Sequence, residues 1–275
     1  DNSNIDNDSA RIIFDVSVAS GDPTPSGVIL WTHINPLHFD ATEGLIFQVS
    51  KDPACNVVMI EGSVNPSDIS ANKDYTVKID LDGQLDANQV YYYRFIYKGI
   101  SSRIGRCRTL PIEDAYTEKL KLAVLTCQDY TNGYYGALNY VATDESIDFV
   151  VHLGDFIYET AGDPRFQSLP FSDRTIILPS NGIVALGVQD YRHLYKTYRS
   201  DLNLQLAMEV HTWIITTDDH ETANDAYWDY ERDTFDPYLF KEMEQAVDRI
   251  RCAVREGEKM LVFSDYDADG VCGAA

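Results

Sequence analysis

The sequence lacks any apolar run near the roughly 20 residues that a membrane-spanning helix requires. Its first residues, DNSNIDNDSA, are polar and unlike the apolar centre of a signal peptide. The five cysteines are odd in number and lack the spacing of a zinc site. We expect no membrane span, and we interpret Cys55 and Cys107 as small core residues, with a disulfide between them as the alternative if the protein is exported.

Basic residues are also scarce. The 22 Lys and Arg residues stand against 44 Asp and Glu residues, which gives a formal net charge of -22. Such an excess repels nucleic-acid phosphates and acidic membranes unless cations or a local basic patch intervene. We therefore expect no nucleic-acid partner for the main domain, and two explanations of the acidity stay open: a soluble surface, or bound metal ions.

Apolar and aromatic residues are plentiful, with 44% hydrophobic residues, 18 Tyr and 11 Phe in a chain of 275 residues. This composition predicts a folded protein of about two domains. Short β-rich runs separated by turns follow a polar N-terminal segment at 1–13, among them FDVSVASGDPTPSGVILWTHI, DYTVKIDLDG and QVYYYRFIYKG. They predict an all-β sandwich of the fibronectin or immunoglobulin type over residues 14–112.

The pattern changes after Pro111, where strand-like and helix-like segments alternate. The predicted strands are KLAVLTC, DFVVHLGD and HTWIITTDDHE, and the predicted helices are YGALNYVATDE and DYRHLYKTYRSDLNLQLAM. Strands separated by helices indicate a mostly parallel sheet with covered faces. Residues 113–232 are therefore expected to form an α/β domain.

Reactive side chains stand where these three strands end. One strand ends at Cys127, the next at Asp155, and the third at Asp218, Asp219 and His220. Parallel strands bring their carboxyl ends to the same edge of a sheet, which is where open α/β sheets bind ligands. We therefore expect Cys127, Asp155 and Asp219 to cluster.

Two interpretations of Asp155 stay open at this point. It is either a turn or capping acid, or a carboxylate that bridges two metal ions for phosphoryl transfer, with His220 as general acid or phosphate-facing group. His152, within the second strand, is expected to pack beneath the site rather than to bind metal.

Five stretches of the chain carry a family resemblance, and in order they are VASGDPTPSGVILWT, TCQDYTNGYYGALNYVA, DFVVHLGDFIYE, YRSDLNLQ and DDHETAND. Taken together and in this order, they resemble the PhoD-type alkaline phosphatases. These are metal-dependent phosphomonoesterases and phosphodiesterases with the calcineurin-like metallophosphatase fold, and the resemblance covers about residues 14–231. It implies a β-sandwich followed by an α/β metallophosphatase domain, phosphate-ester small molecules as substrates, and an extracellular or periplasmic location.

The resemblance also implies a metal site. Cys127, Asp155 and Tyr158 match the family's ligands of a ferric ion, Fe(3+), and Asp155 matches the bridge to a second metal, commonly calcium, Ca(2+). Thiolate and phenolate donors suit iron better than magnesium, although other divalent metals stay open.

Three further residues match the family's pattern around the second metal. The resemblance implies that Asp219 is a second-metal ligand and that His220 faces the phosphate, both as catalytic residues. Asn224 stands where the family often has an asparagine and is a further candidate ligand.

One departure from the family concerns histidine. The family takes further ligands, including histidines, from a long C-terminal part, whereas the last of the six histidines here is His220. We therefore expect the phosphatase domain to lack its C-terminal part, the metal site to be incomplete, and the activity to be weakened.

The tail at 233–275 combines a helical apolar stripe from Phe240 to Val254, the strand-like run MLVF and the acidic run DYDADG. With these features it resembles the first motif of DHH-family phosphoesterases, in particular RecJ-type exonucleases. In that family, residues matching Asp265, Asp267 and Asp269 help to hold manganese. Because the later motifs of the family are absent, we expect no metal on these acids, and we place the junction between Tyr230 and Phe240.

Two alternative functions follow from these features. One is a DHH-type nucleic-acid phosphodiesterase fragment, and the other is a non-enzymatic β-sandwich binding protein with a degenerate phosphatase domain. The apolar stripe also leaves self-association through the tail open.

Overall fold

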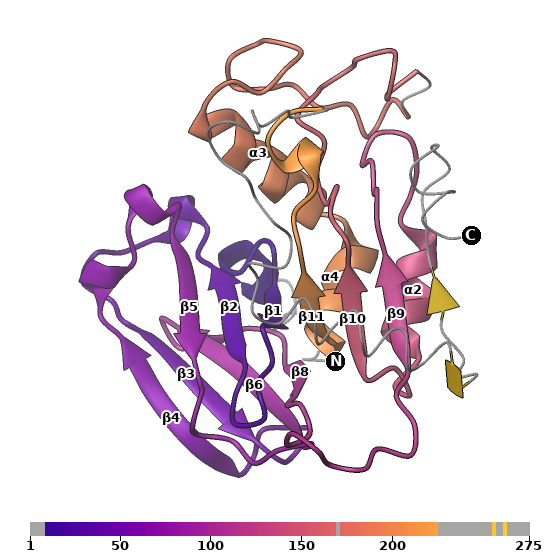
Figure 1. The fold of residues 1–275 in the computed structure, drawn as a ribbon. Helices are drawn as coiled ribbons and strands as arrows, with labels where there is room; N and C mark the ends of the chain where they lie inside the picture. The colour runs from indigo at the N-terminus through magenta and orange to yellow at the C-terminus, as the bar shows by residue number, and fades with distance from the viewer. Residues whose placement is uncertain (1–8, 169–170, 225–254, 257–260, 263–275) are drawn as a thin grey trace, which may run out of the picture.

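The computed structural model describes residues 9–168, 171–224, 255–256 and 261–262. Its strands form one sheet of seven strands and a second, antiparallel sheet (Figure 1). The apolar stripe from Phe240 to Val254, the acids Asp265, Asp267 and Asp269, and the expected junction lie outside the described residues.

The N-terminal part is built from strands, as the sequence predicts. The second sheet contains β3 (Leu45–Ser50), β4 (Val58–Val64), β6 (Val90–Tyr97), β7 (Ile100–Ser101) and β8 (Gly105–Arg108). Facing it are β1 (Val18–Gly21), β2 (Ile29–His33) and β5 (Thr76–Asp80), with short 3-10 helices at Pro36–His38, Pro66–Asp68 and Ala71–Lys73. Alternate residues of β6 are fully buried, and they join Val18 and Leu30 of the facing strands in one apolar core. Two sheets packed through such a core form a β-sandwich.

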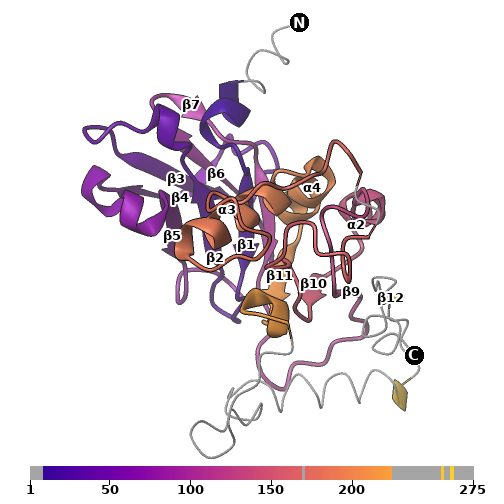
Figure 2. The same cartoon turned by 90° about the horizontal axis from the view of Figure 1, so that it is seen from above.

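The C-terminal part has the predicted parallel strands. They are β9 (Leu122–Leu125), β10 (Phe149–His152) and β11 (Thr212–Ile215), and β10 pairs with both neighbours in parallel. The helices are α2 (Gly136–Thr143), α3 (Val188–Arg199) and α4 (Leu202–Val210). All three lie on one side of the strands (Figure 2), where Ala123, Val150 and Trp213 form a buried layer with helix residues.

The two parts share one continuous sheet. Strand β1 pairs in parallel with β11, through Ser20 with Thr212 and Gly21 with Trp213. With β12 (Leu261–Val262) at one edge, the sheet order is β12-β9-β10-β11-β1-β2-β5. Because side chains alternate along a strand, Val18 of β1 enters the sandwich core while Ala19 enters the helix-covered core. The expected sandwich therefore does not stand apart from the α/β part, a feature that local sequence patterns do not reveal.

The prediction of one continuous helix over residues 190–208 is wrong. The structure has two helices there, α3 and α4, which are separated by Ser200 and Asp201. The Asp201 carboxylate caps α4 by accepting hydrogen bonds from the backbone N–H groups of Asn203 and Leu204, at 2.9 and 3.2 Å. Aspartate in this position is a common helix start signal, and a buried ion pair from Arg174 at 2.6 Å fixes it further.

Part of the expected tail strand is present. Strand β12 (Leu261–Val262) pairs in parallel with β9, through Leu261 with Ala123 and Val262 with Val124. The chain near the predicted run MLVF therefore extends the edge of the parallel sheet.

The structure bears on two expectations, the state of Cys55 and Cys107 and the lack of a membrane span. Cys55 and Cys107 are free thiols, 1% and 0% exposed, so the prediction of small core residues is confirmed. Within the described ranges, no helix has the length and apolar character needed to cross a membrane.

Candidate metal centre

The loops after β9, β10 and β11 lie together at the carboxyl edge of the sheet. The backbone N–H of Cys127 donates to the carbonyl of Gly154 at 3.2 Å, and that of Gln128 donates to the carbonyl of Asp155 at 3.0 Å. The Sγ atom of Cys127 lies 3.4 Å from Oδ2 of Asp155. Backbone hydrogen bonds between the two loops thus continue beyond the ends of the strands, and they place the thiol of Cys127 beside the carboxylate of Asp155.

The backbone at this edge is left-handed in three places. Cys127 and Asp155 have φ angles of 51° and 53°, and Gly154 has a φ angle of 113°. A Cβ atom on Gly154 would lie 2.5 Å from the backbone nitrogen of Asp218. Only glycine fits this close approach, which explains why the apolar run of β10 ends in Gly-Asp.

Asp155 is the centre of a buried polar cluster. It is 2% exposed, and its Oδ1 accepts a hydrogen bond from the backbone N–H of His220 at 3.3 Å. Burial raises the pKa of the Asp155 carboxyl to about 7; the charge of His220 opposes this rise, and Asp218 and Asp219 add to it. Ligand atoms of Asp155, Asp219 and His220 all lie within 4.8 Å of one another. The structure therefore brings together Cys127, Asp155 and Asp219, as expected.

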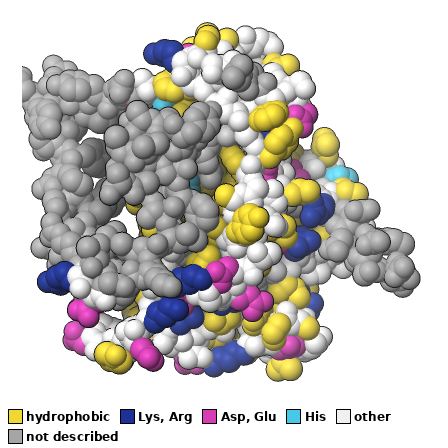
Figure 3. All heavy atoms as spheres, turned by 90° about the vertical axis from the view of Figure 1, so that its right-hand side faces the viewer, with side chains coloured by type: hydrophobic (Ala, Val, Ile, Leu, Met, Phe, Trp, Pro, Cys, Tyr) yellow, Lys and Arg dark blue, Asp and Glu magenta, His cyan; other side chains and the backbone are white. Residues whose placement is uncertain are grey.

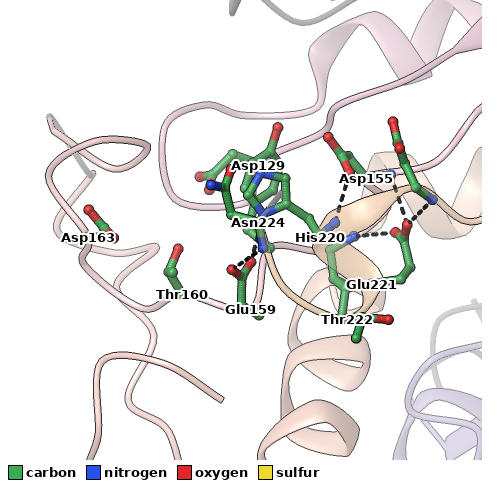
Figure 4. Close-up of polar contacts among 12 residues, drawn as sticks. Asp129, Asp155, Glu159, Thr160, Asp163, His220, Glu221, Thr222 and Asn224 are labelled. Carbon is green, nitrogen blue, oxygen red and sulfur yellow. Dashed lines mark hydrogen bonds and ion pairs between the residues drawn. The ribbon is translucent and has the colours of Figure 1, made fainter. Parts of the chain in front are cut away.

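His220 is held by Glu159, which the sequence reasoning did not select as a site residue. The Nδ1 atom of His220 lies 2.6 Å from Oε2 of Glu159, and the backbone N–H of Asn224 donates to Oε1 of Glu159 at 2.8 Å (Figure 4). Burial lowers the pKa of His220, but the hydrogen bond that its Nδ1–H donates to Glu159 and the negative charge of Glu159 outweigh burial and raise the pKa overall. The pKa of Glu159 is lowered, because the His220 and Asn224 hydrogen bonds outweigh burial.

Glu221 is a second residue that the sequence reasoning missed. Its Oε2 accepts from the backbone N–H groups of Asp155 and Asp218, at 3.1 and 2.7 Å, and its Oε1 accepts from those of Phe156 and Ile157, at 2.6 and 3.4 Å. One carboxylate therefore ties the loop after β10 to the loop after β11. The pattern of Asp218 and Glu221 three residues apart is a capping box, so a sequence signal for this role was present.

The remaining predicted residues lie at the same place. Tyr158 is 2% exposed, and its ring centroid lies 4.2 Å from that of His220. Asn224 follows the 3-10 helix Asp219–Glu221 and is bonded to Glu159 through its backbone, beside His220 in Figure 4. All six predicted site residues are thus within the cluster, while their individual roles stay predictions.

His152 packs beneath the centre, as predicted. It is fully buried, its ring stacks on Trp213 with centroids 6.2 Å apart, and its Nδ1 accepts from the backbone N–H of Gly154 at 3.2 Å. Burial lowers the pKa of its imidazole to about 3. A neutral histidine therefore supports the turn that presents Asp155.

The fold and site are those of an α/β protein with a ligand site at the carboxyl edge of its parallel strands, where two carboxylates and a histidine could hold a metal ion. Two family models match the chain: PhoD-like phosphatase, N-terminal domain, over residues 2–111, and PhoD-like phosphatase over residues 122–255. The chain belongs to the PhoD-like phosphatase family.

Individual relatives agree with this assignment. The chain is 36% identical over 220 residues to alkaline phosphatase D of Bacillus subtilis (strain 168), a match that covers 77% of the chain and 36% of that protein. A solved structure described as the structure of PhoD superposes with a TM-score of 0.66 at 32% identity, covering 78% of this chain and 40% of that one. The chain therefore spans less than half the length of these relatives.

A shorter match concerns a different protein. The chain is 49% identical over 39 residues to the single-stranded-DNA-specific exonuclease RecJ of Bacillus subtilis (strain 168). This match covers 14% of the chain and 5% of that protein, so it supports a local resemblance only.

Proposed function

We propose that this chain carries the metal-binding core of a phosphoric ester hydrolase that acts on small phosphate monoesters and diesters. The observation that carries the proposal is the convergence of Asp155, Asp219 and His220 within 4.8 Å at the carboxyl edge of the parallel sheet. Membership of the PhoD-like family supplies the reaction class, because its members named above are phosphatases.

The donor set fits metal ions. Asp155 is a buried carboxyl close to the carboxyls of Asp218 and Asp219. A cation placed among them would offset both the cost of burying a charged carboxylate and the repulsion between the carboxylates. The thiol of Cys127 on the same carboxyl suits iron or zinc. These contacts support the proposal of two ions, with Asp155 between them.

The identity of the ions is proposed from the resemblance. Cys127, Asp155 and Tyr158 would hold a ferric ion, and Asp155, Asp219 and Asn224 would hold a calcium ion. Bound together, two such ions acidify a water molecule and neutralise charge on phosphate oxygens.

His220 has a separate role in this proposal. Its Nδ1 is engaged by Glu159 at 2.6 Å, which leaves Nε2 as the ring atom that can donate to a phosphate oxygen or to the leaving group. Glu159 keeps the imidazole in one orientation and favours its protonated form, and it acts as a positioning residue.

The test measures hydrolysis of p-nitrophenyl phosphate and bis-p-nitrophenyl phosphate, with metal content determined on the same sample. Asp155→Asn removes the proposed bridging charge, and we expect it to lower both metal content and turnover by at least about 100-fold. Asp173→Asn is the matched control, because Asp173 is an exposed acid that accepts a hydrogen bond from the Tyr134 hydroxyl and lies outside the proposed ligand set. Equal turnover by Asp155→Asn and the unchanged chain would contradict the proposal.

The same assay addresses the expectation that the site is incomplete. Low turnover with less than one metal ion per chain would agree with it, and turnover with two ions bound would contradict it. An extracellular or periplasmic location is likewise proposed from the resemblance, and fractionation of the cells that make the protein tests it. Self-association through the tail stays a prediction.

A further inference from the structure

A pocket with a volume of about 280 Å³ lies between helix α3 and the strands β2 and β5, apart from the residues of the metal centre. One wall is the indole of Trp31, over which the guanidinium of Arg199 stacks at 3.8 Å. This volume is at the lower end of the roughly 300–1,000 Å³ of small-molecule sites, so it suits a small ligand. The charged and titratable residues in its lining are His33, Lys73, Asp74, Arg192, Tyr195, Lys196 and Arg199.

The lining is cationic, in contrast to the chain as a whole. Four Lys and Arg side chains face one carboxylate, although acids outnumber bases two to one in the sequence. On the described part of the face in Figure 3, by comparison, basic and acidic side chains are interspersed. The pocket therefore concentrates positive charge, unlike the described part of the face in Figure 3.

Little of this charge is neutralised locally. Asp74 pairs with Lys196 at 2.8 Å. Arg192 donates to the backbone carbonyls of Ala71 and Asn72, at 3.2 and 2.6 Å, and Lys73 only to a backbone carbonyl at 3.5 Å. Carbonyl groups satisfy hydrogen bonds but carry no net charge. Three cations of the pocket therefore lack an anionic partner among the described residues, namely Lys73, Arg192 and Arg199.

Two buried nitrogen atoms in the lining also lack a hydrogen-bond partner within the described ranges. They are Nε2 of His33 and Nε of Arg199. His33 is 1% exposed, and its Nδ1 is bound to Asp15 at 2.7 Å, so its ring is fixed with Nε2 on the other side. With Nδ1 donating to the Asp15 carboxylate, Nε2 of His33 is an acceptor in the neutral ring and a donor in the imidazolium, whereas Nε of Arg199 is always a donor. Unpaired buried polar atoms are rare in folded proteins, and each one calls for an explanation.

We propose that this pocket binds a small oxyanion of the phosphate class, either inorganic phosphate or the terminal phosphate of a small ester. An anion supplies an acceptor for Arg199, and for Nε2 of His33 when that ring is protonated, and it offsets the charge of Lys73 and Arg192. Arginine and lysine are the usual partners of phosphate oxygens. The site is separate from the metal centre, so it holds a second anion per chain.

The test follows the side chain of His33 by nitrogen-15 NMR of the whole chain during titration with sodium phosphate. His33→Asn assigns the signal. We expect a saturable shift of Nε2 at phosphate concentrations up to about 10 mM, which is ten times a Kd of about 1 mM. No shift in this range, or an equal shift with sodium chloride, would overturn the proposal.

Variants at the rim of the pocket avoid disturbing the stacked Arg199. The double variant Lys73→Gln with Arg192→Gln should weaken the His33 response by at least about tenfold. Lys78→Gln is the matched control, since Lys78 is an exposed lysine of β5 that does not line this pocket. Phosphate inhibition of ester hydrolysis should stay unchanged in both variants, which separates this site from the metal centre. If Lys78→Gln weakened the His33 response as much as the double variant, the proposal would be overturned.

Titration with glycerol 1-phosphate distinguishes the two sources of the anion. Tighter binding than inorganic phosphate would identify an ester as the ligand, and equal or weaker binding would identify free phosphate. Failure of ester hydrolysis in the chain would refute the proposed function without affecting the His33 response.

Discussion

The imidazole Nδ1 of His220 and the carboxylate Oε2 of Glu159 lie 2.6 Å apart, with both side chains almost fully buried. Glu159 also accepts the backbone N–H of Asn224. One carboxylate thus orients the histidine and the chain that follows it, which makes Glu159 the main support of His220 in the described structure.

Replacement of Glu159 by glutamine is expected to lower kcat by about 10–100-fold, the usual effect of losing a partner that orients a site residue. KM and metal content should change little, because the variant keeps Asp155, Asp219 and Cys127. Steady-state kinetics with metal analysis measure this, and exposed Glu145→Gln serves as control. Loss of metal in parallel with kcat would show that Glu159 supports the metal ligands rather than the histidine.

Glu221→Ala is expected to destabilise the fold by about 2–3 kcal/mol, since four backbone N–H groups lose their acceptor. Glu221→Gln retains one carbonyl oxygen and should cost less. Urea unfolding measures both variants. A cost below about 0.5 kcal/mol for the alanine variant would mean that water replaces the carboxylate fully.

Gly154→Ala is expected to cost several kcal/mol and to displace Asp155. The added Cβ meets the backbone of Asp218 at 2.5 Å, in addition to the strain of a φ angle of 113°. Gly162→Ala is the matched control, because Gly162 has a φ angle of 89° and open space around its Cβ position. The control should cost only about 1–2 kcal/mol in unfolding experiments, and equal costs for the two variants would exclude the steric explanation.

His152 is expected to make stability depend on pH. Burial lowers the pKa of its imidazole to about 3 in the fold, whereas an unfolded histidine titrates near 6.5. Between these two pKa values the unfolded state therefore binds more protons than the folded state. The contribution of neutral His152 to the free energy of unfolding is complete above pH 6.5 and is lost as the pH falls towards 3. The slope from this residue is about 1.4 kcal/mol per pH unit near pH 5.

Urea unfolding at several pH values from 5 to 7 measures this effect. His152→Asn keeps an acceptor for the N–H of Gly154 and should flatten the dependence by that slope. Parallel curves for the variant and the unchanged chain would show that His152 has the same pKa in the fold as in the unfolded chain, contrary to the effect of burial.

The sequence by itself determined the three parallel strands of the α/β part and the cluster at their ends. Largely apolar runs before Cys127, Asp155 and Asp218 mark buried parallel strands, and parallel strands necessarily present their ends at one edge. This is why the placement of six site residues followed from local patterns and the family resemblance, and why the packing of His152 followed from strand alternation.

Tertiary structure alone decided which parts join and which side chains support the site. The pairing of β1 with β11 brings together residues about 190 positions apart, and hydrogen bonding between backbones carries no local sequence signature. Glu159 and Glu221 act through chain segments that meet only after folding. The cationic pocket likewise gathers His33, Lys73 and Arg192 from distant segments, because charge in a folded protein is concentrated by shape and not by composition.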